Sequence, residues 1–347
     1  MLHKATRFPA EWERQSALFM TWPHAETNWQ PDPLAAEDTF LAIAKTASKS
    51  QKLVIACNDQ AHGFHVESLF RRSRIDPVCY TLYVAPSNDS WARDHGPIGL
   101  LRDGNPHLID FKFNGWGNKY PANHDNRITS MLHAAGAFGH TPIEHIDLVL
   151  EGGSIETDGA GTLLATSRCL VSPTRNPELS ANAIESQLLR YLGCRRILWL
   201  NHGQLLGDDT DGHIDTLARF VDRETIAYVR CDDENDPNYP ELHAMAREIE
   251  TFRQLDGEPY RLIALPCPRM IYSKDGKSLP ASYANFLIIN NAVLVPMYND
   301  PNDAQVLKIL GDCFPERQIV GINALPLIHQ YGSLHCVAIH LLHGVTQ

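Results

Sequence analysis

Long runs of lysine and arginine are absent from this 347-residue chain, whose formal net charge is −11 at pH 7. The longest basic runs are pairs such as Arg71-Arg72 and Arg195-Arg196. Nucleic-acid-binding proteins concentrate Lys and Arg on one surface, so the composition argues against a nucleic-acid partner. An acidic chain suits a cationic ligand instead.

Long apolar runs are absent as well. None approaches the roughly 20 residues that a membrane-spanning helix needs. The first nine residues also lack the order of a signal peptide, in which a basic segment precedes an apolar one. We therefore expect a cytoplasmic protein that does not bind membranes.

The cysteine and glycine patterns of common metal and nucleotide sites are missing too. The eight cysteines show no C-x-x-C spacing, which argues against a zinc knuckle or a disulfide framework, and most of them are expected to be buried. The chain has no H-E-x-x-H, no P-loop and no G-x-G-x-x-G motif. An EF-hand register through Gly212 fails, because it puts Gly207 and Ala218 at the first and last ligand positions.

What the chain does have is a regular alternation of apolar strand patterns and helix patterns. The recurring order is strand, strand, helix, strand, with a charged or glycine-rich loop at each strand end. This order favours a mixed α/β fold and indicates an internal repeat of roughly 60 to 70 residues. No Pro/Ser-rich linker divides the chain, so we predict a single domain over residues 1–347.

The periodicity predicts the positions of the main elements. Helices are expected over residues 33–48, 60–72, 177–192, 241–255 and 303–310. Strands are expected over residues 52–57, 79–84, 98–101, 108–111, 148–150, 163–166, 197–200, 227–229 and 262–265, with a strand pair within 284–296.

The most unusual segment is 207–221, which puts four aspartates and one histidine into nine residues before an apolar tail. Residues from His213 onward alternate in polarity, which predicts a strand with His213 and Asp215 on the same face. The segment could instead bind a metal through its acidic side chains. That alternative uses the following set of ligands: Asp208, Asp209, Asp211, His213 and Asp215.

Two further motifs place carboxylates beside turns. In the segment 91–97, Asp94 could be presented from a loop with Trp91 as an apolar wall for a ligand, or the segment could be a structural corner. In the segment 151–154, Glu151 precedes two glycines that could admit a ligand closely, or it could be a solvated turn residue.

Cys336 follows His335 near the C-terminus. A buried structural cysteine is the commoner fate of such a residue. As a nucleophile it would need a base, which His213 could supply from elsewhere in the fold.

Four motifs in this order resemble the family of agmatine deiminases and bacterial-type peptidyl-arginine deiminases, which modify guanidines. The motifs are Trp91-x-Arg93-Asp94-x-Gly96-Pro97, Glu151-Gly152-Gly153-Ser154, Gly212-His213-x-Asp215 and His335-Cys336. The resemblance implies a pentein fold, a five-bladed pseudo-symmetric α/β propeller built of five pseudo-repeats.

The resemblance also implies the roles of the site residues. Asp94 and Asp215 would grip a guanidinium, Cys336 would be the nucleophile and His213 the general acid/base. Glu151 would be a partner of the guanidinium or of His213. No metal and no cofactor is implied.

The activity implied is the hydrolysis of agmatine to N-carbamoylputrescine and ammonia through a covalent thiouronium on the cysteine. Asp209, Trp91 and Trp116 are candidates for binding the amine or the methylene chain of this small cationic guanidino substrate. Peptidyl-arginine deimination, a metal-dependent hydrolase and a binding protein without turnover remain alternatives. A homo-oligomer is possible.

The chain departs from the usual agmatine deiminase pattern at three places. Glu156 stands where a histidine is expected, and His95 where threonine is common. The segment 331–334 replaces a more glycine-rich approach to His335 and Cys336. These differences bear on the part of the substrate that lies beyond the guanidinium.

Overall fold

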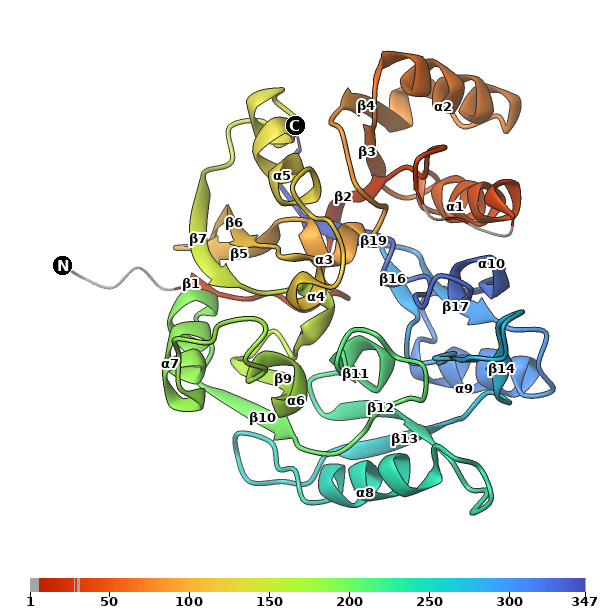
Figure 1. Cartoon of the computed structure of the whole chain (residues 1–347). Helices are drawn as coiled ribbons and strands as arrows, with labels where there is room; N and C mark the ends of the chain where they lie inside the picture. Colours follow the sequence, from red (N-terminus) through yellow and green to blue (C-terminus); the bar gives the residue numbers. More distant parts are fainter. Residues whose placement is uncertain (1–5, 28, 30–31, 347) are drawn as a thin grey trace.

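The computed structural model describes residues 6–27, 29 and 32–346. Five sheets of three or four strands are arranged around a common centre, and the main helices lie on the outside (Figure 1). This is a five-bladed α/β propeller, the fold class that the motif order implies. No helix among the described residues is both long enough and apolar enough to cross a bilayer.

The sheets follow one another around the ring. The first contains β19 (Ala338–Leu342), β2 (Gln15–Thr21), β3 (Lys52–Cys57) and β4 (Tyr80–Val84), with helices α1 (Pro33–Ala47) and α2 (Gln60–Arg72). The second contains β1 (Thr6–Arg7), β5 (Ile98–Arg102), β6 (Asn105–Lys112) and β7 (Ile143–Val149), with helix α5 (Asp125–Ala134). The third contains β8 (Ile155–Thr157), β9 (Thr162–Thr166) and β10 (Arg196–Leu200), with helices α6 (Ser167–Leu170) and α7 (Ala181–Leu192).

The fourth and fifth sheets contain three strands each. The fourth contains β11 (Ala218–Asp222), β12 (Thr225–Arg230) and β13 (Arg261–Pro266), with helix α8 (Tyr239–Ile249). The fifth contains β16 (Leu287–Ile289), β17 (Ala292–Met297) and β18 (Gln318–Asn323), with helices α9 (Asp303–Cys313) and α10 (Leu325–Ile328). A small hairpin, β14 (Ile271–Tyr272) and β15 (Ser278–Leu279), lies between them in the chain.

Each sheet repeats one topology. An antiparallel pair, such as β11 with β12, is followed by an outer helix and then by a strand that pairs in parallel with the second strand. The same rule holds for β5-β6-β7, β8-β9-β10 and β16-β17-β18. In the first sheet the antiparallel partner β19 comes from the C-terminus, so its pairing with β2 closes the ring.

Local sequence explains several element boundaries. Asp103 and Gly104 both have positive φ (51° and 79°) and form the two-residue turn between β5 and β6, which is a geometry that Asp-Gly favours. Asp59 caps helix α2 by accepting a hydrogen bond from the His62 N–H at 2.8 Å. Gly193 ends helix α7 in the left-handed conformation.

A cluster of buried charges lies where the sheets meet. The Glu11 Oε2 atom is 2.7 Å from His335 Nε2, 3.1 Å from Arg93 Nη2 and 3.2 Å from Arg219 Nη2. Arg219 also donates from Nε to Glu156 at 2.7 Å and has no exposed side-chain surface. Burial alone would raise the pKa of Glu11, but the nearby cations lower it well below its ordinary value.

Arg219→Met tests how much the fold depends on this cluster. The change leaves Glu11 and Glu156 buried with less compensation, so we expect the free energy of unfolding to fall by about 3 kcal/mol or more. The measurement is urea denaturation followed by circular dichroism. Arg230→Met is the matched control, since Arg230 pairs with Asp232 on the exposed surface and should leave stability unchanged. Equal stability of the two variants would contradict the expectation.

Candidate active site

The four sequence motifs meet near the centre of the ring, although they are far apart in the chain. Asp94 lies on the short helix α3 (Ala92–His95), and Asp215 lies in the 3₁₀ turn Ile214–Thr216. Cys336 lies two residues before β19, and its carbonyl accepts a hydrogen bond from the Arg93 N–H at 3.1 Å. This backbone bond holds the C-terminal segment against helix α3.

A pocket opens onto Asp94 and Cys336. Its walls mix aromatic, acidic and hydroxyl side chains. The lining residues are Asp89, Trp91, Asp94, Trp116, Tyr120, Asp209, Thr210, Thr216, Gln330, Tyr331, Gly332 and Cys336.

The prediction that His213 and Asp215 share a strand face is wrong. His213 is the residue before a 3₁₀ turn, and β11 begins only at Ala218. The Thr216 N–H bonds the His213 carbonyl at 3.2 Å, which closes the turn before the strand can start. His213 and Asp215 therefore reach the centre from a turn. Similarly, Asp94 is presented by helix α3 and not by an open loop.

Asp94 is fixed by two donors. Its Oδ1 accepts from the Gly153 N–H and its Oδ2 from the Trp116 Nε1–H, both at 2.9 Å. Trp116 itself has positive φ (55°) within the turn Gly115–Asn118. Burial is the main cause that raises the pKa of Asp94, and the neighbouring carboxylate of Asp215 adds to it.

Asp215 is held from one side only. Its Oδ2 lies 2.7 Å from His335 Nδ1, whereas its Oδ1 is buried and has no hydrogen-bond partner among the described residues. Burial raises the pKa of Asp215, but the hydrogen bond and charge of His335 outweigh that effect and lower it. A buried carboxylate oxygen without a donor is costly, which marks this atom as a place for a ligand's N–H group.

The Cys336 thiol lies beside the Asp215 carboxylate and the Asn285 amide. Its Sγ is 3.9 Å from Asp215 Oδ2 and 3.4 Å from Asn285 Oδ1. Burial, followed by the charges of Asp215 and Asp94, raises the pKa of the thiol well above its ordinary value. Both causes favour the protonated form of the thiol.

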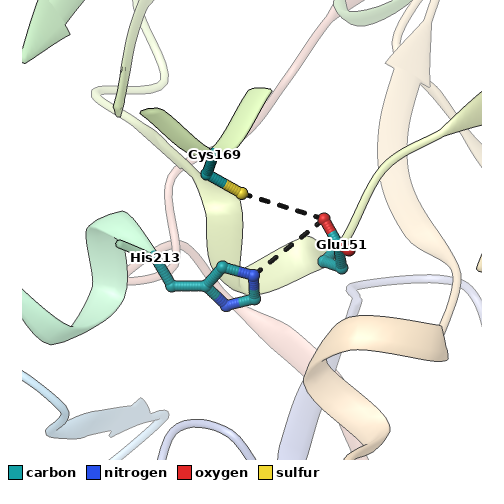
Figure 2. Close-up of side chains that lie close together, drawn as sticks. All are labelled: Glu151, Cys169 and His213. Carbon is teal, nitrogen blue, oxygen red and sulfur yellow. Dashed lines mark hydrogen bonds and ion pairs between the residues drawn. The ribbon is translucent and has the colours of Figure 1, made fainter. Parts of the chain in front are cut away.

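His213 is buried between Asp94 and Glu151. Its Nδ1 is 3.7 Å from Asp94 Oδ1, and its Nε2 is 4.0 Å from Glu151 Oε2 (Figure 2). Burial lowers the pKa of His213, but the charges of Asp94 and of its other neighbours raise it well above its ordinary value. Glu151 lies beside this imidazole and also accepts from Arg175 Nε at 3.0 Å. It is not among the residues that line the pocket.

The loop aspartates do not converge on one point. Asp208 accepts from the N–H groups of Thr210 and Gly212 and so shapes the loop. Asp211 forms ion pairs with Lys119 and Arg175. The alternative in which the segment 207–215 binds a metal is therefore not supported, because its five side chains are not brought together. The group of possible ligands that the described residues bring together is a different one: Glu151, Cys169 and His213.

Asp209 has a different environment from these two aspartates. It is half-buried, lines the pocket and accepts from the Tyr120 hydroxyl at 2.9 Å. Burial, with the charge of Asp208, raises the pKa of Asp209 to about 6. Trp91 and Trp116, the predicted apolar walls, line the same pocket.

Several residues of the site were not predicted from the sequence. Asp89 lines the pocket, and burial raises its pKa to about 6. Its position two residues before Trp91 was the one available signal. Tyr120, Arg175 and His335 as a partner of Asp215 had no comparable signal, because their partners come from distant segments.

The departures from the motif pattern have distinct structural settings. Glu156 is paired with Arg219, so its carboxylate belongs to the buried charge cluster. His95 is buried beside Thr21 and does not line the pocket; burial lowers its pKa to about 3. Tyr331, with φ of 68°, is in the pocket wall.

Comparison with known proteins identifies the family of the chain. The model of the Porphyromonas-type peptidyl-arginine deiminase family matches residues 7–341. An agmatine deiminase of Stutzerimonas stutzeri is 30% identical over 358 residues, covering 95% of this chain and 93% of that protein.

The chain is also similar to solved structures of deiminases. A Porphyromonas gingivalis protein provisionally named an arginine deiminase is 46% identical with a TM-score of 0.91, covering 99% of this chain and 100% of that one. A C. jejuni agmatine deiminase with substrate bound is 35% identical with a TM-score of 0.89, covering 98% and 97% of the two chains.

The fold and these matches define the protein as a deiminase, a hydrolase that acts on carbon–nitrogen bonds. The chain belongs to the Porphyromonas-type peptidyl-arginine deiminase family, within which agmatine deiminases are its relatives.

Gly153→Ala tests whether the centre of the site tolerates a single added carbon. A Cβ at Gly153 would lie 2.7 Å from His213 Nδ1, 2.8 Å from Asp94 Oδ1 and 3.0 Å from Asp215 Oδ2. We expect deiminase activity to fall about 100-fold or more, because reacting groups displaced by about 1 Å lose that much rate.

Gly311→Ala is the matched control, since a Cβ there meets only Ile319 at 3.8 Å. Both variants should fold, as judged by thermal melting, and only Gly153→Ala should lose turnover. Full activity of Gly153→Ala would show that the three side chains do not act at this point.

Proposed function

We propose that this protein is an agmatine deiminase, which hydrolyses agmatine to N-carbamoylputrescine and ammonia through a covalent intermediate on Cys336. The observation that carries the proposal is the unpartnered Oδ1 of Asp215, a carboxylate whose other oxygen lies 3.9 Å from Cys336 Sγ beside the pocket that Asp94 and Cys336 line. A planar cation with several N–H donors suits this arrangement.

The guanidinium would sit between Asp94 and Asp215. Each carboxylate can accept N–H donors through lone pairs that the protein does not use, and the pair fixes the central carbon for attack. The bound cation also offsets the charges of the two aspartates. Because those charges hold the thiol of Cys336 in its protonated form, substrate binding favours the thiolate.

The first half of the reaction forms a carbon–sulfur bond. Cys336 loses its thiol proton to solvent, its Sγ adds to the guanidinium carbon, and the carbon–nitrogen bond then breaks. His213 supplies the proton with which ammonia leaves, and an S-alkylthiouronium remains on the cysteine.

The second half uses water. His213 takes a proton from the water, whose oxygen adds to the thiouronium carbon. The carbon–sulfur bond breaks, the sulfur regains a proton, and the ureido product is released. In this scheme Glu151 supports the imidazolium of His213, which has to gain and lose a proton in each cycle.

The rest of the pocket favours an amine at the substrate's other end. Asp89 and Asp209 are half-buried, whereas Asp94 is buried, so these two carboxylates lie nearer to solvent along the same pocket. No lysine or arginine is among the described residues that line it, so the carboxylate of free arginine would lack a partner. Trp91 and Trp116 can flank the methylene chain.

Peptidyl-arginine deimination is the second candidate. It is favoured by the description of the matching family. A neutral peptide backbone, however, would gain little from Asp89 and Asp209, whereas an ammonium group can form charge-assisted hydrogen bonds with both.

The decisive experiment measures ammonia and ureido product from agmatine, free arginine and an Nα-acyl-arginine peptide. We expect kcat/KM for agmatine to exceed the other two by about 100-fold, the value of two hydrogen bonds to charged groups. Cys336→Ala should abolish turnover, and Cys313→Ala, a half-buried cysteine outside the pocket, should not.

Two results would overturn these assignments. Preference for the peptide would replace agmatine with peptidyl-arginine, and activity in Cys336→Ala would remove the covalent step. A strong chelator should leave activity intact, whereas a thiol alkylator should abolish it. The opposite pattern would favour the metal-dependent hydrolase.

The KM for agmatine should fall as pH rises through about 6. Asp209 and Asp89 have their pKa values raised to about 6 by burial, so below this pH they are neutral and cannot pair with the ammonium. In Asp209→Asn we expect KM at pH 8 to rise about tenfold and its pH dependence to become shallower.

Asp147→Asn, a change of an exposed aspartate outside the pocket, is the control and should behave as the unmodified protein. KM values are measured from pH 5 to pH 8 at constant ionic strength. An Asp209→Asn profile that matches the unmodified protein would exclude Asp209 from amine binding.

A further inference from the structure

The proposed reaction leaves one buried thiol beside the general acid/base without a role. Cys169 lies on helix α6, and its Sγ is 3.9 Å from Glu151 Oε2 (Figure 2). The same Glu151 oxygen is 4.0 Å from His213 Nε2. A sulfur, a nitrogen and a carboxylate oxygen thus face one another within 4.8 Å.

Each of the three side chains has an atom available for a ligand. Arg175 binds Oε1 of Glu151, which leaves Oε2 facing Cys169 and His213. Among the described residues, neither ring nitrogen of His213 has a partner at normal hydrogen-bond distance and angle, although the side chain is only 1% exposed and the Cys169 thiol interacts with the ring and raises its pKa. A buried imidazole of this kind lacks a hydrogen-bond partner at Nε2.

The spacing is close to that of a tetrahedral metal site. Typical Zn–S, Zn–N and Zn–O bonds place the ligand atoms of such a site about 3.4 to 3.6 Å apart. The measured separations of 3.9 and 4.0 Å from Glu151 Oε2 exceed this by about 0.3 to 0.6 Å. Small side-chain rotations can supply that contraction.

We propose that Glu151, Cys169 and His213 form an inhibitory site for a borderline-soft divalent cation such as Zn²⁺. Sulfur and imidazole ligands select such ions over Mg²⁺ and Ca²⁺, and a single ion here would leave a fourth position open. Binding releases the proton of the Cys169 thiol and the Nε2 proton of the His213 imidazolium, so the thiolate and the Glu151 carboxylate together balance the charge of the ion.

The location explains why the ion would inhibit. A metal on Nε2 occupies the lone pair of His213 and holds the imidazole in one protonation state, so it cannot gain and lose a proton. This part rests on the proposed role of His213 as general acid/base. Binding itself does not, because it depends only on the three ligands.

Binding is therefore measured where turnover is impossible. In Cys336→Ala protein, titration with Co²⁺ should give one equivalent bound, with a thiolate-to-cobalt charge-transfer band, and Zn²⁺ should displace it. Adding Cys169→Ala should remove the band and weaken binding about tenfold or more. Adding Cys194→Ala instead should change neither, since Cys194 is a buried cysteine outside the triad.

Inhibition is measured with Cys336 intact. Each variant's activity with Zn²⁺ is compared with its own activity in a chelator, so a change in basal rate does not enter. The Zn²⁺ concentration that halves activity should rise about tenfold or more in Cys169→Ala and stay unchanged in Cys194→Ala. Mg²⁺ should not inhibit either protein.

The outcomes test the metal site and the role of His213 separately. A missing charge-transfer band, or a band that survives Cys169→Ala in a protein that melts normally, overturns the metal site. Binding at the triad without inhibition keeps the site and rejects the role of His213. Cys169→Ser, which preserves the size of the side chain, serves as the second variant if the alanine variant does not fold.

Discussion

The carboxylate of Glu11 is the constraint on which the rest of the site depends. It is buried where the sheets meet and is compensated by His335, Arg93 and Arg219. These partners come from the segment before β19, from helix α3 and from β11. An uncompensated charge at this depth would cost several kcal/mol, so any arrangement that buried Glu11 without these partners would be disfavoured by that amount.

One residue, His335, connects this charge cluster to the site. His335 lies 2.7 Å from Glu11 on one side and 2.7 Å from Asp215 on the other, so a ring with both nitrogens protonated donates to both carboxylates. This orients Asp215 and leaves its Oδ1 free. Asp94 has no imidazole at hydrogen-bond distance, because His213 Nδ1 is 3.7 Å away. Burial therefore outweighs the charge of His213 and raises the pKa of Asp94, whereas the pKa of Asp215 is lowered. Two carboxylates that face one ligand thus have unequal affinities for a proton.

Much of the secondary structure could be predicted from the sequence, because it depends on local patterns. Apolar periodicity and turn residues predict helix α2 and the β5–β6 hairpin closely. The charge cluster could not be predicted, because the pairs of Glu11 with Arg93 and of Glu156 with Arg219 depend on how distant segments meet. The strand prediction for the segment from His213 was wrong for a different reason. Alternating polarity is typical of a strand, but here it accompanies a 3₁₀ turn whose residues are buried by surrounding sheets.

The open ring nitrogens of His213 connect its proposed role in proton transfer with the proposed inhibition by a metal ion. An imidazole that must gain and lose a proton cannot be tied into two strong hydrogen bonds, as His335 is, because those bonds would hold it in one protonation state. His213 is instead surrounded by carboxylates at 3.7 and 4.0 Å, which attract its charge but leave its nitrogens open. Any buried site that keeps an imidazole open beside a thiol and a carboxylate also has the donor set of a zinc site. The geometry that suits His213 for proton transfer therefore also suits it for binding a metal ion.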